Sequence, residues 1–336
     1  MSSPLHTTAD PDLFRCSEKS ASHFPNFGKA VVVLFLVVFS GCASTIQPVA
    51  EGPEVPGLTD TPSWVPQGLW RLPDSRFVVG AYRDTRQKNE LGEHIGPVRL
   101  SLLSEETPPH HIEILKQGEP LLSHAGGIAI HNGFLYIANA LDGRVFRGDW
   151  DPDAEAIEVQ TFLTNPTSAD TVAIGPDGLL WVGQFYLQFT AYNRRLGTWR
   201  DQNGRAKHAL IIAYEPQTAR PVKALAVRGR LQGFAITPDW IVLSCSYGQN
   251  RASHLGIYPT PLQGEAHDHV QLPDGTLLPL YHLNVRTKNH KLPPMSEEIF
   301  VDRDHIWVVY ESGALSRFPR TRNRINAILS YPLPQR

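Results

Sequence analysis

Short apolar runs recur in pairs from about residue 66 to the end of the chain, and a tight turn separates the two members of each pair. The turns are rich in Gly, Pro, Asn and Asp, which supply the positive φ or the preset angle that hairpins require. Five such pairs can be recognised, and the second strand of each contains one anchor residue: Val78, Tyr136, Trp181, Val242 or Trp307. The pattern predicts an all-β chain in which one hairpin is reused.

The pairs are spaced widely enough for about four strands each, because a propeller blade with its loops takes roughly 40–50 residues. Alternating runs at 143–146, 210–213 and 315–318 are interpreted as third and fourth strands, and 270–278 as a further hairpin. Sheets stacked around an axis bury both faces, and closing the ring removes exposed ends. We therefore predict a β-propeller, with five blades favoured and six or seven as alternatives. A β-sandwich competes, but it does not explain the recurring hairpin.

The first 41 residues have the pattern of a signal peptide. Lys29 precedes an apolar run at 30–39, which is too short to span a bilayer but fits a signal-peptide core. The next residues, Ser40, Gly41 and Cys42, together with Phe39, resemble a bacterial lipobox, in which Leu rather than Phe is usual. The resemblance implies cleavage before Cys42, lipidation of its thiol, and acylation of the new amino terminus by a chain such as palmitate. The alternative is a buried element of a cytosolic protein that happens to end in Cys.

Residues 42–66 contain five prolines and predict an extended tether that holds the body away from a membrane. The expected organisation is a signal peptide at 1–41, a lipidated tether at 42–66 and a propeller domain at 67–336. Several acyl chains together give stable anchoring. Ala43, which follows the lipidated cysteine, favours the outer membrane of a bacterial cell envelope.

Composition narrows the range of partners. The 336 residues carry a formal net charge of -2, which argues against a nucleic-acid binder. Of the three cysteines, only Cys245 would remain as a free thiol after processing and lipidation, and its apolar strand predicts a small buried residue. The sequence has no HExxH, GxSxG, CxxC or phosphate-cradling motif.

Two stretches, AGGIAIHNGFLYIANALDGRVFR and IGPDGLLWVG, resemble blades of the SMP-30/NHL-like propeller superfamily. Two others, LSCSYGQNRASHLGIY and KLPPMSEEIFVDRDHIWVVYESGALSRF, resemble a group of exported bacterial propeller proteins of unassigned activity. These motifs are specific for architecture rather than for chemistry, because propellers host enzymes, binders and scaffolds alike.

Polar residues gather where the innermost strands of the expected blades begin. In a propeller these starts crowd at one mouth of the central channel. The residues expected there are Gln67, Gly126, Asp170, Gln232 and Glu297, with His124 and Glu298 nearby. The second strands end in another polar set, which includes Tyr82, and its members to test first are Arg83, Arg251 and Glu311. We expect a ligand site at this mouth. The alternative is that these groups hydrate the channel and satisfy backbone hydrogen bonds.

The resemblance to SMP-30-like lactonases adds a metal hypothesis, because those enzymes hold a cation with carboxylate and amide oxygens. It implies Ca²⁺ as a possible cofactor, with Asp170, Glu297 and Asn139 as ligands. Three functions therefore stay open. The chain is a binding module for an envelope protein or a small polar ligand, a calcium-dependent lactonase-like hydrolase, or a lyase or isomerase acting on an exported polysaccharide or metabolite.

Overall fold

The computed structural model describes residues 44–335 except 91, 141, 191–194, 202–203 and 284–285. The expected signal peptide and Cys42 lie outside the described residues. Within that part of the chain, no helix has the length and apolar character needed to cross a membrane.

Nearly all of the regular structure described is β-strand, arranged in five larger sheets and one small pair. The first sheet contains β3 (Trp64–Arg71), β4 (Phe77–Arg83), β6 (His94–Leu103), β7 (His110–Lys116) and β13 (Ala156–Glu158), with the short strands β5 (Gln87–Lys88), β8 (Glu119–Pro120) and β9 (Leu122–Ser123) beside them. The second contains β10 (Gly127–His131), β11 (Phe134–Asn139), β12 (Arg144–Asp149) and β14 (Gln160–Thr164).

The third sheet contains β15 (Thr171–Ile174), β16 (Leu180–Gly183), β19 (Ala209–Tyr214), β20 (Pro221–Val227), β25 (Leu277–His282) and β24 (Asp268–Gln271). The fourth contains β21 (Leu231–Ile236), β22 (Trp240–Cys245), β23 (Ser253–Pro259), β26 (Lys288–Leu292) and β1 (Ser44–Thr45). The fifth contains β27 (Ser296–Asp302), β28 (His305–Tyr310), β29 (Ala327–Pro332) and β2 (Ala50–Glu54). The small pair is β17 (Trp199–Arg200) with β18 (Ala206–Lys207), and a 3₁₀ turn, η2 (Glu311–Gly313), follows β28.

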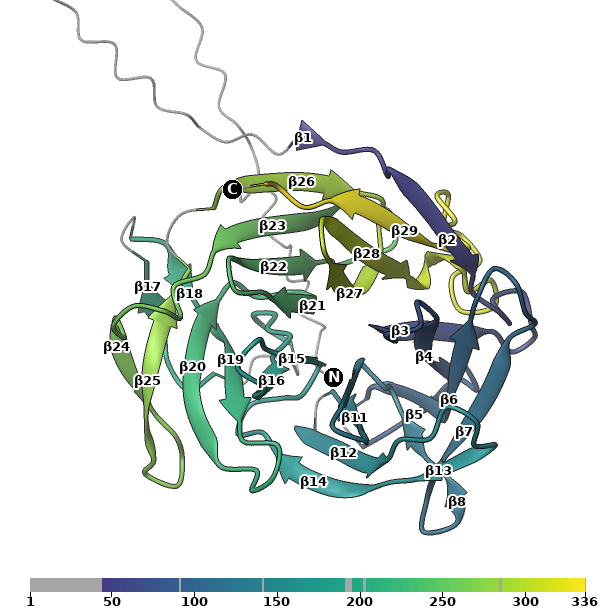
Figure 1. Cartoon of the computed structure of the whole chain (residues 1–336), viewed down its shortest axis with the longest axis horizontal. Helices are drawn as coiled ribbons and strands as arrows, with labels where there is room; N and C mark the ends of the chain where they lie inside the picture. Colours follow the sequence, from purple (N-terminus) through teal and green to yellow (C-terminus); the bar gives the residue numbers. More distant parts are fainter. Residues whose placement is uncertain are drawn as a thin grey trace, which may run out of the picture. The chain divides into compact units, whose positions relative to one another are not determined.

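The five sheets surround a central axis as the blades of a β-propeller (Figure 1). Their innermost strands are β3, β10, β15, β21 and β27, and each of these strands packs against the next around a closed ring. Antiparallel hairpins build each blade outward from its innermost strand. The expected all-β propeller is therefore confirmed.

The core lies between neighbouring sheets. Strands in the middle of a blade are buried on both faces, and all six residues of β19 are buried. Trp181 and Tyr136 are among the largest side chains that are fully buried. Burial of such a side chain stabilises the fold by about 1.5–3 kcal/mol.

The fifth sheet joins the two ends of the described chain. Its outer strand, β2, comes from the segment that we expected to be a tether, and it pairs with β29 near the carboxyl terminus. The preceding strand, β1, pairs with β26. This part of the expected tether is therefore wrong, because β29 has an open edge that β2 covers. The bulge between Glu51 and Glu54 accommodates Pro53, since proline is tolerated at a bulge in an edge strand.

Most of the further apolar runs that we interpreted as strands are strands in the structure, but one is not. Residues 210–213 lie within β19, residues 143–146 overlap β12, and residues 270–278 overlap β24 and β25. Residues 315–318, which we expected to form a strand, are instead part of the irregular segment after η2, and β29 takes their place in the sheet. Within this segment Phe318 is buried and Leu315 is exposed.

Candidate functional site

Three of the innermost strands carry a β-bulge where they begin, at the same end of the ring. The register of β3 with β4 shifts at Gln67, and that of β21 with β22 shifts at Gln232. The register of β27 with β28 shifts across Glu297 and Glu298. A bulge re-aims a side chain out of the ladder, and bulges are frequent next to functional sites. Repetition of one device on three blades brings these polar side chains to the mouth that we expected from the sequence.

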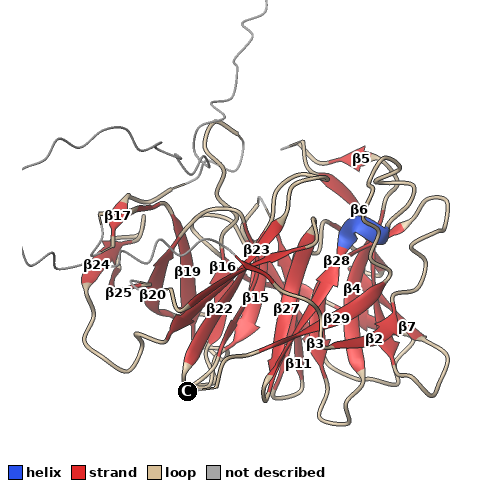
Figure 2. Cartoon of the chain, turned by 90° about the horizontal axis from the view of Figure 1, so that it is seen from above, coloured by secondary structure: helices blue, strands red, loops and turns tan. Residues whose placement is uncertain are grey.

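The two glutamates at this mouth form a hydrogen-bonded pair. Glu297 lies on β27 and is 1% exposed, whereas Glu311 starts η2 and is partly buried. Their carboxyl groups share a hydrogen bond, which requires a proton on one of them. Figure 2 shows η2 next to β28 and at the same end of the ring as β5.

Each glutamate also accepts a hydrogen bond from a glutamine that a bulge presents. Gln232 Nε2 donates to Glu297 Oε1 at 3.0 Å, and Gln67 Nε2 donates to Glu311 Oε2 at 3.2 Å. Gln67 Nε2 also donates to the Pro66 carbonyl at 3.1 Å. The pair is thus held by amides from the first and the fourth sheets.

Burial raises the pKa of both carboxyl groups, because it disfavours the charged form. The pKa of Glu297 lies well above its ordinary value, owing first to burial and then to the adjacent Glu311. Burial raises the pKa of Glu311 to about 7, although the positive charge of Arg317 and the hydrogen bond from Gln67 act in the opposite direction. The pair therefore holds a proton near neutral pH.

Arg317, Tyr82 and His124 complete the surroundings of the pair. The Arg317 guanidinium lies near the Glu311 carboxyl and near the Tyr82 hydroxyl. Tyr82 is fully buried, and its ring centroid lies 4.8 Å from that of His124. His124 Nδ1 lies 2.9 Å from the His94 carbonyl oxygen. Burial lowers the pKa of His124 to about 4, so the ring is neutral near pH 7 and donates this bond.

Glu298 occupies a different position, within the ring of inner strands. Its Oε1 accepts a hydrogen bond from Thr171 Oγ1 at 2.7 Å, and its Oε2 lies against Gly127 on β10. Burial raises the pKa of Glu298 well above its usual value, while its hydrogen bonds from Thr171 and from nearby backbone amides offset part of that effect. Glu298 therefore packs within the channel, where three blades contact it.

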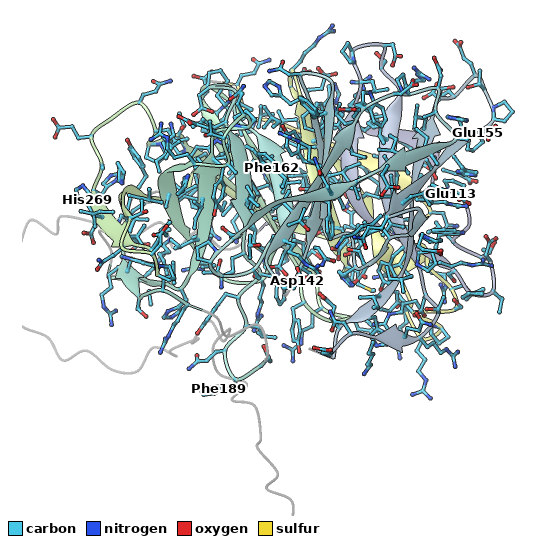
Figure 3. All side chains as sticks on the ribbon, turned by 90° about the horizontal axis from the view of Figure 1, so that it is seen from below. Glu113, Asp142, Glu155, Phe162, Phe189 and His269 are labelled. Atoms are coloured by element: carbon cyan, nitrogen blue, oxygen red, sulfur yellow. The ribbon has the colours of Figure 1, made fainter. Side chains whose placement is uncertain are left out.

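The remaining candidates from the sequence are engaged elsewhere. Asp170 is 6% exposed and accepts hydrogen bonds from Phe185 N at 2.7 Å and from Ser168 Oγ. Asn139 accepts a bond from Ser123 Oγ and donates to Asp142 Oδ2 at 2.6 Å. Asp142 lies at the same end of the ring as Phe189, whose side chain is exposed (Figure 3).

The three expected calcium ligands do not fit a cation site. Asp170 accepts hydrogen bonds from Ser168 and Phe185, whereas Asn139, the last residue of β11, bonds Ser123 and Asp142. Glu297 shares a proton with Glu311. In the described part of the chain, no group of three His, Cys, Asp or Glu side chains gathers as metal ligands. We derive no step through calcium.

Arg83 and Arg251, which we expected at the mouth, do not join the polar cluster. Arg83 is exposed, and its guanidinium carbon lies 6.0 Å from the centroid of the Trp64 ring. Arg251 is exposed in the loop after β22, where its backbone amide donates to the Gly248 carbonyl. Sequence reasoning instead missed Arg317, because its alternating neighbours imitate a strand.

Two surface hollows lie away from this mouth. A hollow of about 250 Å³ is lined by the β10–β11 turn, Tyr136, Arg147 and Pro216, and a second of about 750 Å³ lies beside β12, β13 and β14. Their main polar groups are already engaged. Arg147 stacks near the Phe134 and Phe162 rings and donates to Pro216 O at 3.3 Å, and Glu158 accepts from the backbone of residues 117 and 118. The mouth is therefore the stronger candidate site.

Comparison with known proteins adds no family assignment. No protein-family model and no curated protein matches the sequence. The fold is similar to a PQQ-bound aldose sugar dehydrogenase from Streptomyces coelicolor, with 13% identity, a TM-score of 0.47 and coverage of 87% of this chain and 99% of the other.

Two further solved structures show the same level of similarity. RS223 β-xylosidase has 9% identity, a TM-score of 0.48 and coverage of 81% and 93% of the two chains. Virginiamycin B lyase from Staphylococcus aureus, solved with quinupristin, has 9% identity, a TM-score of 0.40 and coverage of 84% and 99%. Similarities this distant carry no argument about chemistry.

Proposed function

We propose that this chain is a membrane-anchored propeller lipoprotein of the bacterial envelope, and that it binds a small polar ligand at the mouth of its channel. The observation that supports the site most strongly is the Glu297–Glu311 pair, which amides on two other bulged strands hold in place. Buried titratable groups with strongly shifted pKa values cluster at functional sites, which supports a binding role for this pair.

The chemistry of the mouth favours a small polar ligand over an apolar protein surface. Its side chains offer carboxyl, carboxamide, guanidinium and phenol groups, which form directional hydrogen bonds. A few convergent polar groups of this kind fix the orientation of a small molecule in its site. An envelope protein that covers the mouth is the competing partner.

The test is ligand binding by wild type and by matched variants. A panel of sugars and sugar acids is screened by thermal shift, and each hit is measured by calorimetry. We expect Glu297→Gln and Glu311→Gln to weaken binding at least tenfold, because each removes the proton that the pair shares. Arg303→Gln, an exposed substitution in the β27–β28 turn, serves as the control. Unchanged binding in both glutamate variants would exclude the mouth as the site.

A lyase or isomerase acting on an exported polysaccharide or metabolite is the second candidate. It is favoured by the same carboxyl pair, because a group with a pKa of about 7 can both give and take a proton near neutral pH. Solvent deuterium would enter a turned-over ligand in D₂O, as mass spectrometry can detect. A ligand that binds and shows no exchange and no product identifies a binding module instead.

The anchor is tested separately from the site. We expect Cys42→Ser to move the protein from the membrane fraction to the soluble fraction in a bacterial host that processes lipoproteins, because the lipid-bearing thiol is removed. Cys245→Ser provides the matched control, since burial raises the pKa of that thiol to about 11 and makes it unreactive. Equal fractionation of Cys42→Ser and wild type would remove the anchoring proposal.

A further inference from the structure

The start of the described chain is held at the outer edge of the fourth sheet. β1 is the outermost strand of that sheet and pairs with β26, with Thr45 opposite Lys291 (Figure 1). Ser44 Oγ also lies 3.2 Å from His290 Nδ1. Cys42 precedes Ser44 by two residues, and two extended residues span at most about 7 Å. A lipid on Cys42 would therefore keep this edge of the propeller close to a membrane surface.

One row of side chains crosses the fourth sheet and ends at β1. Cys245 on β22 pairs with His254 on β23, and His254 pairs with Lys291 on β26. Lys291 in turn pairs with Thr45 on β1. Directly paired residues on neighbouring strands share one face of a sheet. The face that carries Cys245 and His254 therefore extends to the edge that the anchor would hold.

Four cations gather around this row, and we call them the basic strip: Arg228, Arg230, Arg286 and Lys291. Burial raises the pKa of Cys245 to about 11, although the three arginines of the strip act in the opposite direction. Burial lowers the pKa of His254, and Arg286, Lys291 and Arg230 lower it further. The charges that act most strongly on both groups are thus positive.

The basic strip is open to solvent. Two of its members, Arg228 and Lys291, are exposed, and the other two are half-buried. Among the described residues, Arg228, Arg286 and Lys291 form no ion pair with a carboxylate. The neighbouring Lys207 differs, because it is buried and pairs with Asp201 at 3.3 Å. The strip therefore presents its positive charge to solvent.

An exposed aromatic ring borders the strip. Tyr247 follows the end of β22 and is 46% exposed, and the guanidinium carbon of Arg230 lies 5.4 Å from its ring centroid. Tyrosine is enriched where membranes meet water, because its ring is apolar and its hydroxyl is polar. Arginine beside an exposed tyrosine therefore suits the headgroup region of a bilayer.

We propose that this face of the fourth sheet lies against an anionic phospholipid surface, with the basic strip on lipid phosphates beside the Cys42 anchor. The inference rests on the proposed anchoring and goes beyond it, because it states which face meets the membrane. Anionic lipids attract basic side chains near the surface, and such a second signal strengthens attachment by acyl chains. A guanidinium also matches phosphate oxygens with parallel N–H donors.

Hydrogen exchange of the processed, lipidated protein tests this orientation. The protein is purified in detergent from a host that processes lipoproteins, and it is reconstituted into vesicles of phosphatidylcholine alone or of equal parts phosphatidylcholine and phosphatidylglycerol. Mass spectrometry then measures backbone exchange in peptides that cover residues 246–252 and 286–292. The double variant Arg228→Gln/Lys291→Gln is compared with Arg303→Gln, an exposed control in the β27–β28 turn, and circular dichroism checks that each is folded.

We expect exchange in these two segments to be slower by about threefold or more in the anionic vesicles, because lipid headgroups cover this face only when they attract the strip. The double variant should lose the difference between the two vesicles, and Arg303→Gln should keep it. About 1 M salt should also remove the difference, since it reduces the Debye length to about 3 Å.

Equal exchange in the two vesicles, or slowing that persists in the folded double variant, would overturn the inference. Slowing caused by inorganic phosphate in detergent, without vesicles, would also overturn it, because it would identify a site for a free anion. The mass of the amino-terminal peptide separates the two proposals. A peptide without acyl chains would remove the anchoring proposal together with this inference, whereas an acylated peptide with equal exchange would remove this inference alone.

Discussion

At the scale of the residue, the proton shared between Glu297 and Glu311 has the largest consequence, because it makes stability depend on pH. The two side chains come from β27 and from the start of η2, and each is held by a glutamine from another blade. Like charges this close cannot both ionise at low cost, so the pair titrates as a unit. Its protonation therefore links folding stability to pH.

The first prediction concerns the pH dependence of stability. The pKa of Glu311 rises from its usual 4.5 to about 7 on folding, so the folded state binds more protons between these values. Its contribution is fully present below about pH 4.5 and is lost as pH rises through about 7. We expect Glu311→Gln to reduce the fall in unfolding free energy over this interval by on the order of 1–3 kcal/mol.

Urea unfolding at pH 5 and pH 8 measures this difference, with exposed Glu105→Gln as the control. Glu297 and Glu298, whose pKa values are also raised, preserve part of the fall in the variant. Identical pH profiles for wild type and Glu311→Gln would show that Glu311 is ionised throughout.

At the scale of the element, strand β2 has a structural role that its proline-rich composition does not reveal. Residues 42–66 are rich in proline, and proline removes a ladder hydrogen bond. Nevertheless β2 pairs with β29, and a bulge absorbs Pro53. An uncovered edge strand exposes unpaired backbone groups and promotes association between chains. β2 therefore covers an edge that would otherwise be open.

The second prediction is that a shortened chain beginning at Val55 is less stable than one beginning at Ser44. Loss of β2 together with the two-residue strand β1 should cost roughly 2–4 kcal/mol and lower the melting midpoint by about 5–10 °C, because β29 and β26 lose these partners. Differential scanning calorimetry gives the midpoint, and analytical ultracentrifugation detects the association that an open edge would cause. Equal midpoints and monomeric behaviour for both chains would show that β2 contributes nothing to closure.

The bulges also depend on more than the sequence of the strand that contains them. Gln67, Gln232 and Glu297 precede apolar runs in the sequence, and each lies in the first half of an inner strand. The bulge itself could not be predicted, because it depends on the register with the neighbouring strand. That register turns three separate side chains into one polar cluster.

At the scale of the whole molecule, the inner strands approach so closely that side chains are excluded at some positions. A Cβ added to Gly127 would lie 2.9 Å from the Thr171 Cα and would collide with Glu298 Oε2. A Cβ on Gly233 would lie 2.6 Å from the Glu298 Cα. Glycines on two different sheets therefore permit the ring to close around Glu298.

The third prediction follows from this packing. We expect Gly127→Val to lower the free energy of unfolding by about 1–3 kcal/mol or more, because an inserted side chain forces neighbouring inner strands apart. Urea denaturation measures the loss. Gly264→Ala, in an exposed loop with ample space, should leave stability within about 0.5 kcal/mol of wild type. A variant Gly127→Val as stable as Gly264→Ala would contradict tight closure at this position.

The amino-acid sequence by itself determined the hairpins and the all-β class. Turn residues such as Pro176, Asp177 and Gly178 act within a few positions, and the apolar strands beside them pair with each other directly. The sequence also predicted that Gln232 and Glu297 lie where inner strands begin, whereas Gln67 is the fourth residue of β3. These features are local, so neighbouring residues are sufficient to encode them.

Only the tertiary structure decided how the blades close and which polar groups meet. β2 reaches a strand near the other end of the chain, and Glu311 meets Gln67 across more than half of the sequence. Arg317 joins the mouth from a segment whose alternation indicated a strand, whereas Asp170 and Asn139 form hydrogen bonds with other neighbours. Such contacts depend on the packing of distant blades, and no short-range pattern of apolar and polar residues specifies that packing.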